Sequence, residues 1–383
     1  MSSPFIYLDY NATTPVDKRV LETMLPYFSE KFGNAASHTH AAGWTAKRAI
    51  DDAREQVSKL INCDAQEIVF TSGATEAINL AIKGVYQTYS AKGKHIITYA
   101  TEHSAVLDTC KYLESLGAEV DYLSVDGEGL PDLQLLKKTI REDTILVCAM
   151  YANNETGVIF PVKEIAAIVH EKKSIFFCDA TQAVGKIMVD VQDDGIDLMC
   201  MSAHKIYGPK GVGALYIRRK NPRVTLTPLI HGGGHERGLR SGTLNVPGIV
   251  GLGKACAIAA DEMWDDAQRL SMLRTLLEQS LIDLGSVFVN GSQKQRLAHV
   301  TNLAFAGIKA DRLIALLPGI AISMGSACTS ALPEPSHVIK AMGRESLANS
   351  SVRFSLGKYT TEEEIKSVIA QVSDAVKKLR SEN

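Results

Sequence analysis

The chain has 383 residues, of which 45% are hydrophobic and 22% charged, a composition typical of an ordinary globular protein. Its length favours two domains over a single minimal core. The net charge is −2 and no basic run stands out, which argues against nucleic acid or an anionic membrane as the main partner. The N-terminus has no basic region followed by an apolar core, and no apolar stretch reaches the ~20 residues that span a bilayer, so we expect a cytoplasmic protein.

Seven cysteines are widely spaced along the chain, and no two of them form a CxxC pair. This pattern argues against a disulfide framework and against a zinc or iron–sulfur site made by the protein alone, so no metal site is expected. Most of them lie inside apolar runs such as ILVCAM and IFFCDA and are expected in the core. The seven are Cys63, Cys110, Cys148, Cys178, Cys200, Cys256 and Cys328.

Strand-like and helix-like segments alternate from about residue 46 to residue 219. This alternation predicts an α/β protein with a mostly parallel sheet that helices cover on both faces. Helices are expected over 49–61, 74–84, 104–117 and 161–173, and strands over 67–70, 95–100, 144–151, 174–180, 197–201 and 213–219.

The pattern changes after residue 251. A long helix is expected over about 254–284, followed by short strands such as 300–307 and a last helix over 360–380, where Thr361 and Glu364 have the spacing of a capping box. We therefore predict a large domain over 16–259 and a smaller domain over 260–383. Residues 1–15 are grouped with the smaller domain, although they could belong to either.

Polar residues follow several of the expected strands, and ligands of open α/β sheets bind outside the carboxyl ends of the strands. The strand 67–70 leads through small residues, including Ala74 and Thr75, into a helix whose free N–H groups suit a phosphate. The alternative is ordinary helix capping. The strand 95–100 leads to His103, which either lies flat on an aromatic cofactor or caps the next helix.

The next two strand ends carry an amide and a carboxylate. Asn154 lies in an amide-rich turn that is either a binding group or an ordinary Asx turn. Asp179 ends a fully apolar strand, with Gln182 three residues later, and such a carboxylate needs a cationic partner. The protonated ring nitrogen of pyridoxal phosphate is one such partner, and a structural arginine is the alternative.

The segment MSAHKIYGPKG isolates Lys205 between a buried strand and glycine turns. A desolvated lysine there can lose its proton and attack an aldehyde, although a surface lysine is the alternative. Ser202 and His204 flank Lys205 and can help to hold a phosphate. Together, the five strand ends match what one aldehyde cofactor, pyridoxal 5'-phosphate, requires.

Two further residues lie outside this set. Cys328 stands among small residues in GSACTS, followed by two prolines, which favours an exposed loop whose thiol is either a nucleophile or a surface cysteine without a role. Arg353 interrupts an apolar strand-like run and either binds the carboxylate of an amino acid or makes a structural salt bridge.

With these motifs in place, the chain resembles the cysteine desulfurases of the NifS/IscS family, which are class V aminotransferase-like enzymes dependent on pyridoxal phosphate. The resemblance extends nearly from end to end, and so many ordered matches are far more specific than any single motif. The matching segments are YLDYNATTPVD, FGNAAS, TSGATEAINLAIKG, TEHSAVLDT, NNETGV, DATQAVGK, SAHKIYGPKG, HGGGHERGLRSGT, GSACTS and SVRFSLG.

The resemblance implies a homodimer with the type I aminotransferase-like fold, in which the large domain has a mostly parallel seven-stranded sheet and the smaller C-terminal domain is α+β. It implies a catalytic role for Cys328, Lys205 and His103. Lys205 would hold the cofactor covalently, and its phosphate would be held by Ala74, Thr75, Ser202 and His204, with Thr243 reaching the phosphate in the neighbouring subunit. Asp179 would pair with the ring nitrogen, His103 would stack on the ring, and the ring substituents would contact Asn154 and Gln182. The substrate carboxylate would be bound by Asn34 and Arg353.

The implied reaction converts L-cysteine to L-alanine and a persulfide on Cys328. Its sulfur is expected to serve iron–sulfur cluster assembly or other sulfur-containing biomolecules. Relatives that serve a cluster scaffold often continue beyond the equivalent of Asn383 with a docking tail, so the acceptor, and any transient cluster ligation by Cys328, stay open. Asn11 stands where many relatives have serine, with no obvious chemical consequence.

Two other functions remain as alternatives. A different pyridoxal phosphate reaction, such as transamination or selenocysteine lysis, would not need a nucleophile on a mobile loop, so GSACTS argues against it. A platform for sulfur relay without turnover would not need the whole set of Lys205, Asp179, His103, Arg353 and Cys328.

Overall fold

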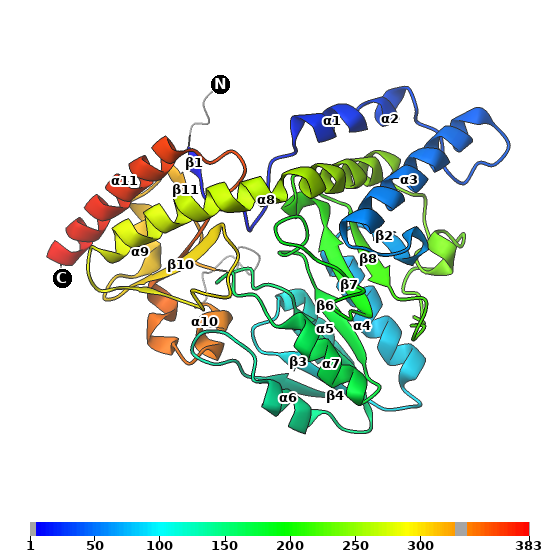
Figure 1. Cartoon of the computed structure of the whole chain (residues 1–383), viewed down its shortest axis with the longest axis horizontal. Helices are drawn as coiled ribbons and strands as arrows, with labels where there is room; N and C mark the ends of the chain where they lie inside the picture. The colour runs from blue at the N-terminus through cyan, green and yellow to red at the C-terminus, as the bar shows by residue number, and fades with distance from the viewer. Residues whose placement is uncertain (1–4, 326–334, 383) are drawn as a thin grey trace.

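The computed structural model describes residues 5–325 and 335–382, and its centre is a seven-stranded sheet (Figure 1). β8 is antiparallel to both of its neighbours, and the other neighbouring pairs are parallel, which confirms the predicted mostly parallel sheet. In spatial order the strands are β2 (Ile68–Thr71), β8 (Gly213–Ile217), β7 (Leu198–Ser202), β6 (Ile175–Asp179), β5 (Thr144–Met150), β3 (His95–Tyr99) and β4 (Glu119–Leu123).

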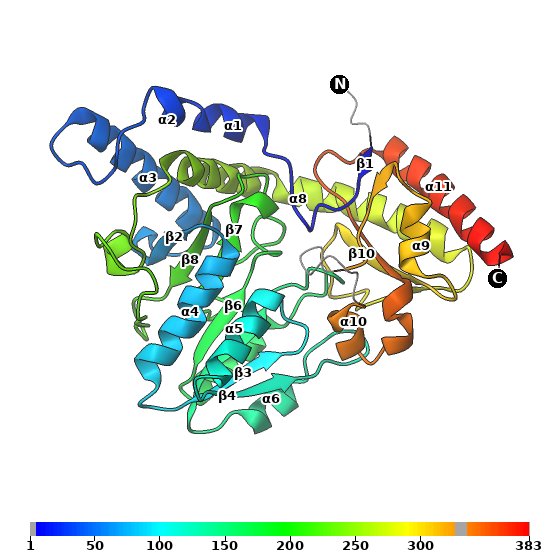
Figure 2. The same ribbon diagram turned by 180° about the vertical axis from the view of Figure 1, so that it is seen from behind.

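Helices cover both faces of this sheet, as the alternating pattern predicts. α4 (Ala74–Tyr89) and α5 (Ser104–Glu114) pack on one face, and they lie in front of the sheet in Figure 2. α3 (Ala41–Leu60), α7 (Val162–Glu171) and the first half of α8 (Val246–Ile282) pack on the other. The remaining helices of this part are α1 (Lys18–Met24), α2 (Pro26–Ser29) and α6 (Leu133–Thr139), with short 3-10 turns at Ala65–Glu67, Ala203–Lys205 and Glu236–Gly238.

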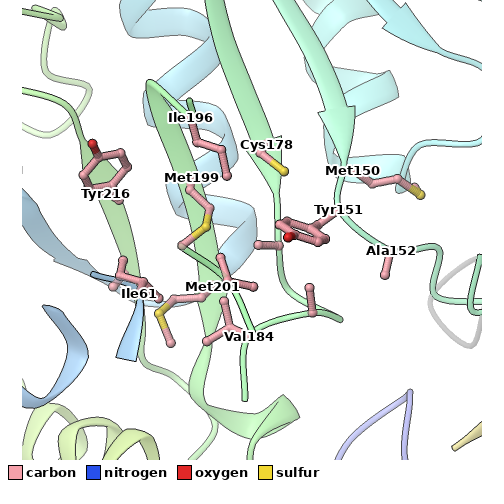
Figure 3. Close-up of a cluster of buried hydrophobic side chains, with 14 of the residues drawn as sticks. Ile61, Met150, Tyr151, Ala152, Cys178, Val184, Ile196, Met199, Met201 and Tyr216 are labelled. Atoms are coloured by element: carbon pink, nitrogen blue, oxygen red, sulfur yellow. The ribbon is translucent and has the colours of Figure 1, made fainter. Parts of the chain in front are cut away.

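The strands alternate between the two cores. On β6, Cys178 points to the core beneath α3, α7 and α8, whereas Phe177 belongs to the core beneath α4 and α5. Figure 3 shows the first of these cores, where Met199 and Met201 of β7 gather with Cys178. Successive side chains of a strand point to opposite faces of the sheet, and both faces are buried here. The sequences of these strands are therefore continuously apolar. Five of the cysteines expected in the core are indeed buried there: Cys110, Cys148, Cys178, Cys200 and Cys256.

A second group of elements packs around its own apolar core beyond the first half of α8 (Figure 1). β12 (Ser351–Ser355), β10 (Val300–Phe305) and β9 (Val287–Val289) form an antiparallel sheet, and β1 (Ile6–Tyr7) pairs with β11 (Ile320–Ala321). α9 (Ala310–Ala315) and α11 (Glu362–Ser381) pack on this core, whereas buried residues of α10 (His337–Ala341) and of the 3-10 turn Glu345–Ser350 belong to the core beneath α3, α7 and α8. α8 runs through residues 259 and 260, where the two predicted domains meet, and that division stays a prediction.

Several details differ from the sequence-based expectations. α8 begins at Val246 instead of near Lys254, and the elements that were not expected include β4 and the helices α1, α2, α6, α9 and α10. β4 is an edge strand whose alternate residues Glu119 and Asp121 are exposed, so it lacks the apolar run that marks the other strands. Within the described ranges, no helix is both long and apolar enough to pass through a membrane.

Candidate active site

A cavity of ≈ 380 Å³ lies at the carboxyl ends of the central strands, where it meets the N-terminal segment and β12. Its walls come from elements that are far apart in the sequence. Of the residues singled out from the sequence, those that line it are Ala74, Thr75, His103, Asn154, Asp179, Gln182, Ser202, His204, Lys205 and Arg353.

One end of the cavity suits a phosphate. The start of α4 faces it with Ala74 and Thr75, and a 16-residue helix leaves free N–H groups and the positive end of its dipole there. The turn before α4 packs closely on β8, because a Cβ on Gly213 would lie 2.8 Å from the Cα of Gly73. Only glycine at 213 permits this approach.

Cationic and polar side chains line the same cavity. They are Ser202, His204, Lys205 and Lys210. Burial, followed by the charges of nearby lysines, lowers the pKa of His204 to about 4, so its ring is neutral at pH 7 and acts through hydrogen bonds. Its Nδ1 lies 3.1 Å from the hydroxyl of Thr13.

Lys205 follows β7 in the 3-10 turn Ala203–Lys205 and extends into the cavity. Its Nζ donates hydrogen bonds to the backbone carbonyls of Asn11 at 2.6 Å and Ala12 at 2.7 Å. The side chain is therefore held in place by the N-terminal segment rather than exposed as an ordinary surface lysine. A lysine so placed can react with an aldehyde that enters the cavity.

Asp179 is the last residue of β6 and is only 7% exposed. Its Oδ1 accepts hydrogen bonds from the Thr181 N–H at 3.0 Å and from the Cys200 thiol at 3.2 Å. Among the described residues no lysine or arginine forms an ion pair with it, so the structural arginine considered above is not found there. A buried carboxylate that faces a cavity and has no ion pair among the described residues is suited to pair with a positively charged ring nitrogen.

Of the two roles considered for His103, the helix cap is present and stacking on a cofactor ring stays a prediction. Its Nδ1 accepts a hydrogen bond from the Ala105 N–H at 3.1 Å, which caps α5, and the same ring lines the cavity. The cap fixes the ring's position, so that a flat ligand would meet an imidazole already in place.

Arg353 lies on β12 and is 1% exposed. Its Nη2 pairs with Asp9 Oδ1 at 2.6 Å, and its Nη1 donates to the carbonyl of Asn154 at 2.8 Å. The salt bridge considered from the sequence is therefore present, yet the guanidinium also borders the cavity. Its role with a carboxylate substrate stays a prediction.

Asn11 is a site residue that sequence reasoning missed. It is 1% exposed, lines the cavity, and accepts from Lys205 and Gln182 through its carbonyl. Its side chain donates to the Asn154 carbonyl at 3.0 Å and lies 2.9 Å from His299 Nε2. The signal that could have revealed it is its position in YLDYNATTPVD, a motif quoted for the resemblance.

Two predicted site residues, Asn34 and Thr243, do not line this cavity. Asn34 is exposed in the loop between α2 and α3, where its Oδ1 accepts from the Ala36 N–H, and Thr243 is exposed shortly before α8. Cys328 lies outside the described residues. The proposed roles of all three stay predictions.

The residues of the cavity fit pyridoxal phosphate in kind. A helix N-terminus faces the cavity, the amine of Lys205 can react with an aldehyde, and the carboxylate of Asp179, which has no ion pair among the described residues, suits the ring nitrogen. An aldehyde cofactor that carries both a phosphate and a basic ring nitrogen would use all three groups.

Comparisons with known proteins agree with this reading. Residues 6–368 match the model of the class-V aminotransferase family. A relative from Anaeromyxobacter sp. (strain Fw109-5), named cysteine desulfurase IscS, is 54% identical over 98% of this chain and 93% of its own length. A solved NifS-like protein has a TM-score of 0.91 at 41% identity, covering 97% of this chain and 99% of its own. A structure described as SspA in complex with cysteine has a TM-score of 0.81 at 38% identity, covering 93% and 100%.

Proposed function

Because the chain belongs to the class-V aminotransferase family and, within it, to the cysteine desulfurases of the NifS/IscS type, we propose that it converts L-cysteine to L-alanine and a persulfide on Cys328. Its cofactor is pyridoxal 5'-phosphate, as in the other members of the family. The observation that carries the proposal is one cavity that holds the amine of Lys205, the carboxylate of Asp179 and the guanidinium of Arg353.

Different residues bind the ring and phosphate of the cofactor and the carboxylate of the substrate. Asp179 pairs with the ring nitrogen and His103 lies against the ring. Asn154 and Gln182 contact the ring substituents. The phosphate is held by Ala74, Thr75, Ser202 and His204, and in a homodimer also by the partner's copy of Thr243. Asn34 and Arg353 bind the substrate carboxylate. Each of these assignments rests on the resemblance, and for the cavity residues also on their positions there.

The proposed chemistry uses one amine and one thiol. Bound pyridoxal phosphate supplies an electron sink. Lys205 takes up and returns the proton of the substrate Cα through Nζ, which the carbonyls of Asn11 and Ala12 hold at the cavity. The Cys328 thiolate attacks the substrate sulfur. An S–S bond forms as the Cβ–S bond breaks, and Cβ receives the electron pair and a proton to become the methyl group of alanine.

We also propose a cytoplasmic homodimer that passes its sulfur to an acceptor protein. The exposed position of Thr243 supports contact with a second subunit. An iron–sulfur cluster scaffold is the first candidate for the acceptor, since the relatives carry the name IscS. We further propose that the two domains divide between residues 259 and 260.

The decisive experiment is the incubation of the purified protein with L-cysteine, followed by mass spectrometry. We expect alanine in solution and about 32 Da, the mass of one sulfur atom, added to the peptide that contains Cys328. The Cys328→Ser variant should retain the cofactor's absorption but release no sulfide on reduction. Desulfuration by this variant at the parent rate would refute the mechanism, and amino-group transfer without sulfide would favour transamination.

A further inference from the structure

The turn after β5 contains a buried carboxylate that the proposed chemistry does not use. Glu155 is 0% exposed, and its Oε1 has no hydrogen-bond partner among the described residues. A buried oxygen without a partner costs stability, so packing alone does not explain this residue. Its backbone is held firmly, because its N–H donates to Asn153 Oδ1 at 2.9 Å and its carbonyl accepts from Asn302 at 3.2 Å.

Gly325, the last described residue before segment 326–334, lies directly against this carboxylate. A Cβ on Gly325 would stand 2.5 Å from Glu155 Oε2 and 3.0 Å from its Cδ. The φ angle of Gly325 is +133°, a conformation that other residues rarely adopt. Both the backbone conformation and the close approach therefore require glycine at this position.

The chain returns to the same carboxylate after the segment. Ser336 Oγ donates to Glu155 Oε2 at 2.5 Å and accepts from the Ile339 N–H at 3.1 Å, which caps α10. Its neighbour His337 lies 3.0 Å from the carbonyl of Glu102, through Nε2. One oxygen of Glu155 thus contacts the chain on both sides of segment 326–334.

The same turn forms part of the cofactor cavity. Asn154, the residue before Glu155, accepts from Arg353 and from Asn11 through its carbonyl. Glu155 therefore connects the cavity, through one peptide unit, to both ends of the segment that contains Cys328.

We propose that Glu155 is a positioning residue that anchors both ends of segment 326–334 to the cavity turn and so sets the presentation of Cys328 to the substrate sulfur. The catalytic part of this inference rests on the proposed function. The structural part does not, because it concerns only the contacts of Gly325 and Ser336 with Glu155.

A pair of variants of equal size isolates the anchor. Ser336→Asn keeps an oxygen to cap α10 and an N–H to donate to Glu155, whereas Ser336→Asp keeps the cap but faces the carboxylate with a second negative charge. Because burial raises the pKa of Glu155, the comparison is made at a pH of about 8.5, well above the usual range of carboxyl groups, and alkylation of Cys328 by iodoacetamide is followed by mass spectrometry. We expect the alkylation rate to rise about tenfold in Ser336→Asp relative to Ser336→Asn.

Activity gives a second measurement. Glu155→Ala should form the Cys328 persulfide about tenfold more slowly, with KM for L-cysteine and the cofactor's absorption unchanged, and Glu155→Gln should restore most of the rate. Equal alkylation rates in the two Ser336 variants would overturn the anchor. If the parent protein makes no alanine, the proposed function fails, while the alkylation rate at Cys328 still tests the anchor on its own.

Discussion

At the scale of single residues, Asn11 makes several hydrogen bonds that join different walls of the cavity. Its carbonyl holds Lys205 and Gln182, and its side chain joins His299 to the carbonyl of Asn154. Burial, and then nearby cationic groups, hold the pKa of His299 well below its usual range, so this ring is neutral and its Nε2–H can donate to Asn11. The asparagine side chain therefore has a chemical consequence that the sequence did not reveal.

The first prediction concerns Asn11→Ser. The shorter side chain cannot reach both the Asn154 carbonyl and His299, which leaves buried polar groups unpaired. We expect the free energy of unfolding to fall by about 1–3 kcal/mol. Urea unfolding followed by circular dichroism measures this loss, and a variant as stable as the parent would show that water replaces the missing bonds.

The second prediction concerns Lys205→Ala. Without the amine, pyridoxal phosphate has no group to bind covalently, so the protein should lose the cofactor on gel filtration together with its visible absorption. Lys172→Ala, which changes an exposed lysine at the end of α7, is the matched control and should keep both. Covalent cofactor that survives in the Lys205 variant would assign this role to another residue.

At the scale of elements, helix packing explains why α8 begins earlier than its composition suggests. Glycines such as Gly251 and Gly253 look like helix breakers, but a Cβ on Gly253 would stand 2.6 Å from the Cα of Ala53 on α3. Gly253 allows α3 and α8 to approach closely, and Asn245 caps the start of α8 by accepting from the Gly248 N–H. Contact between helices thus outweighs intrinsic propensity here.

The third prediction is that Gly253→Ala destabilises the protein. Alanine favours a helix by ~1 kcal/mol over glycine, but the new methyl group collides with the backbone of Ala53. Overpacking costs about 1–3 kcal/mol, so we expect a lower Tm by calorimetry. Gly319→Ala is the control, because a Cβ there meets nothing within 4 Å. A Tm raised by the Gly253 change would mean that the helices separate without cost.

At the scale of the whole molecule, an ion-pair cluster joins the two groups of elements. Glu262 on α8 pairs with Arg19 on α1 at 2.6 Å and with Lys358, which precedes α11. Asp17 joins the cluster through Arg19 at 2.8 Å. The hydrogen bond from Arg19, and then those from Lys358, lower the pKa of Glu262 from 4.5 to about 2.

The fourth prediction follows from this shift. A lowered folded-state pKa means that the cluster's contribution is complete above pH 4.5 and is lost as the pH falls toward about 2. Glu262→Gln should therefore lose less stability than the parent over this interval in acid titrations followed by circular dichroism. Glu142→Gln, an exposed carboxyl without an ion pair among the described residues, should behave like the parent. Identical acid profiles for Glu262→Gln and the parent would show that the ion-pair cluster does not contribute to stability in acid.

Much of the fold could be read from local patterns. The apolar runs of β5, β6 and β7 and the capping box of Thr361 and Glu364 are confirmed, because a buried strand and a helix start each depend on neighbouring residues. The same holds for the polar strand ends, since the carboxyl ends of parallel strands meet at one edge of a sheet.

The partners of those residues could not be read in this way. Lys205 bonds to Asn11, which lies 194 positions earlier in the sequence, and Arg353 bonds to Asp9, 344 positions earlier. Ser336 bonds to Glu155, 181 positions earlier. Such pairs depend on how distant segments cross when the chain folds, and each buried polar atom takes whichever partner that crossing brings. Residue types and local periodicity therefore sufficed to place the chemistry at the strand ends, while the hydrogen-bond partners that orient it emerge only when the whole chain has packed.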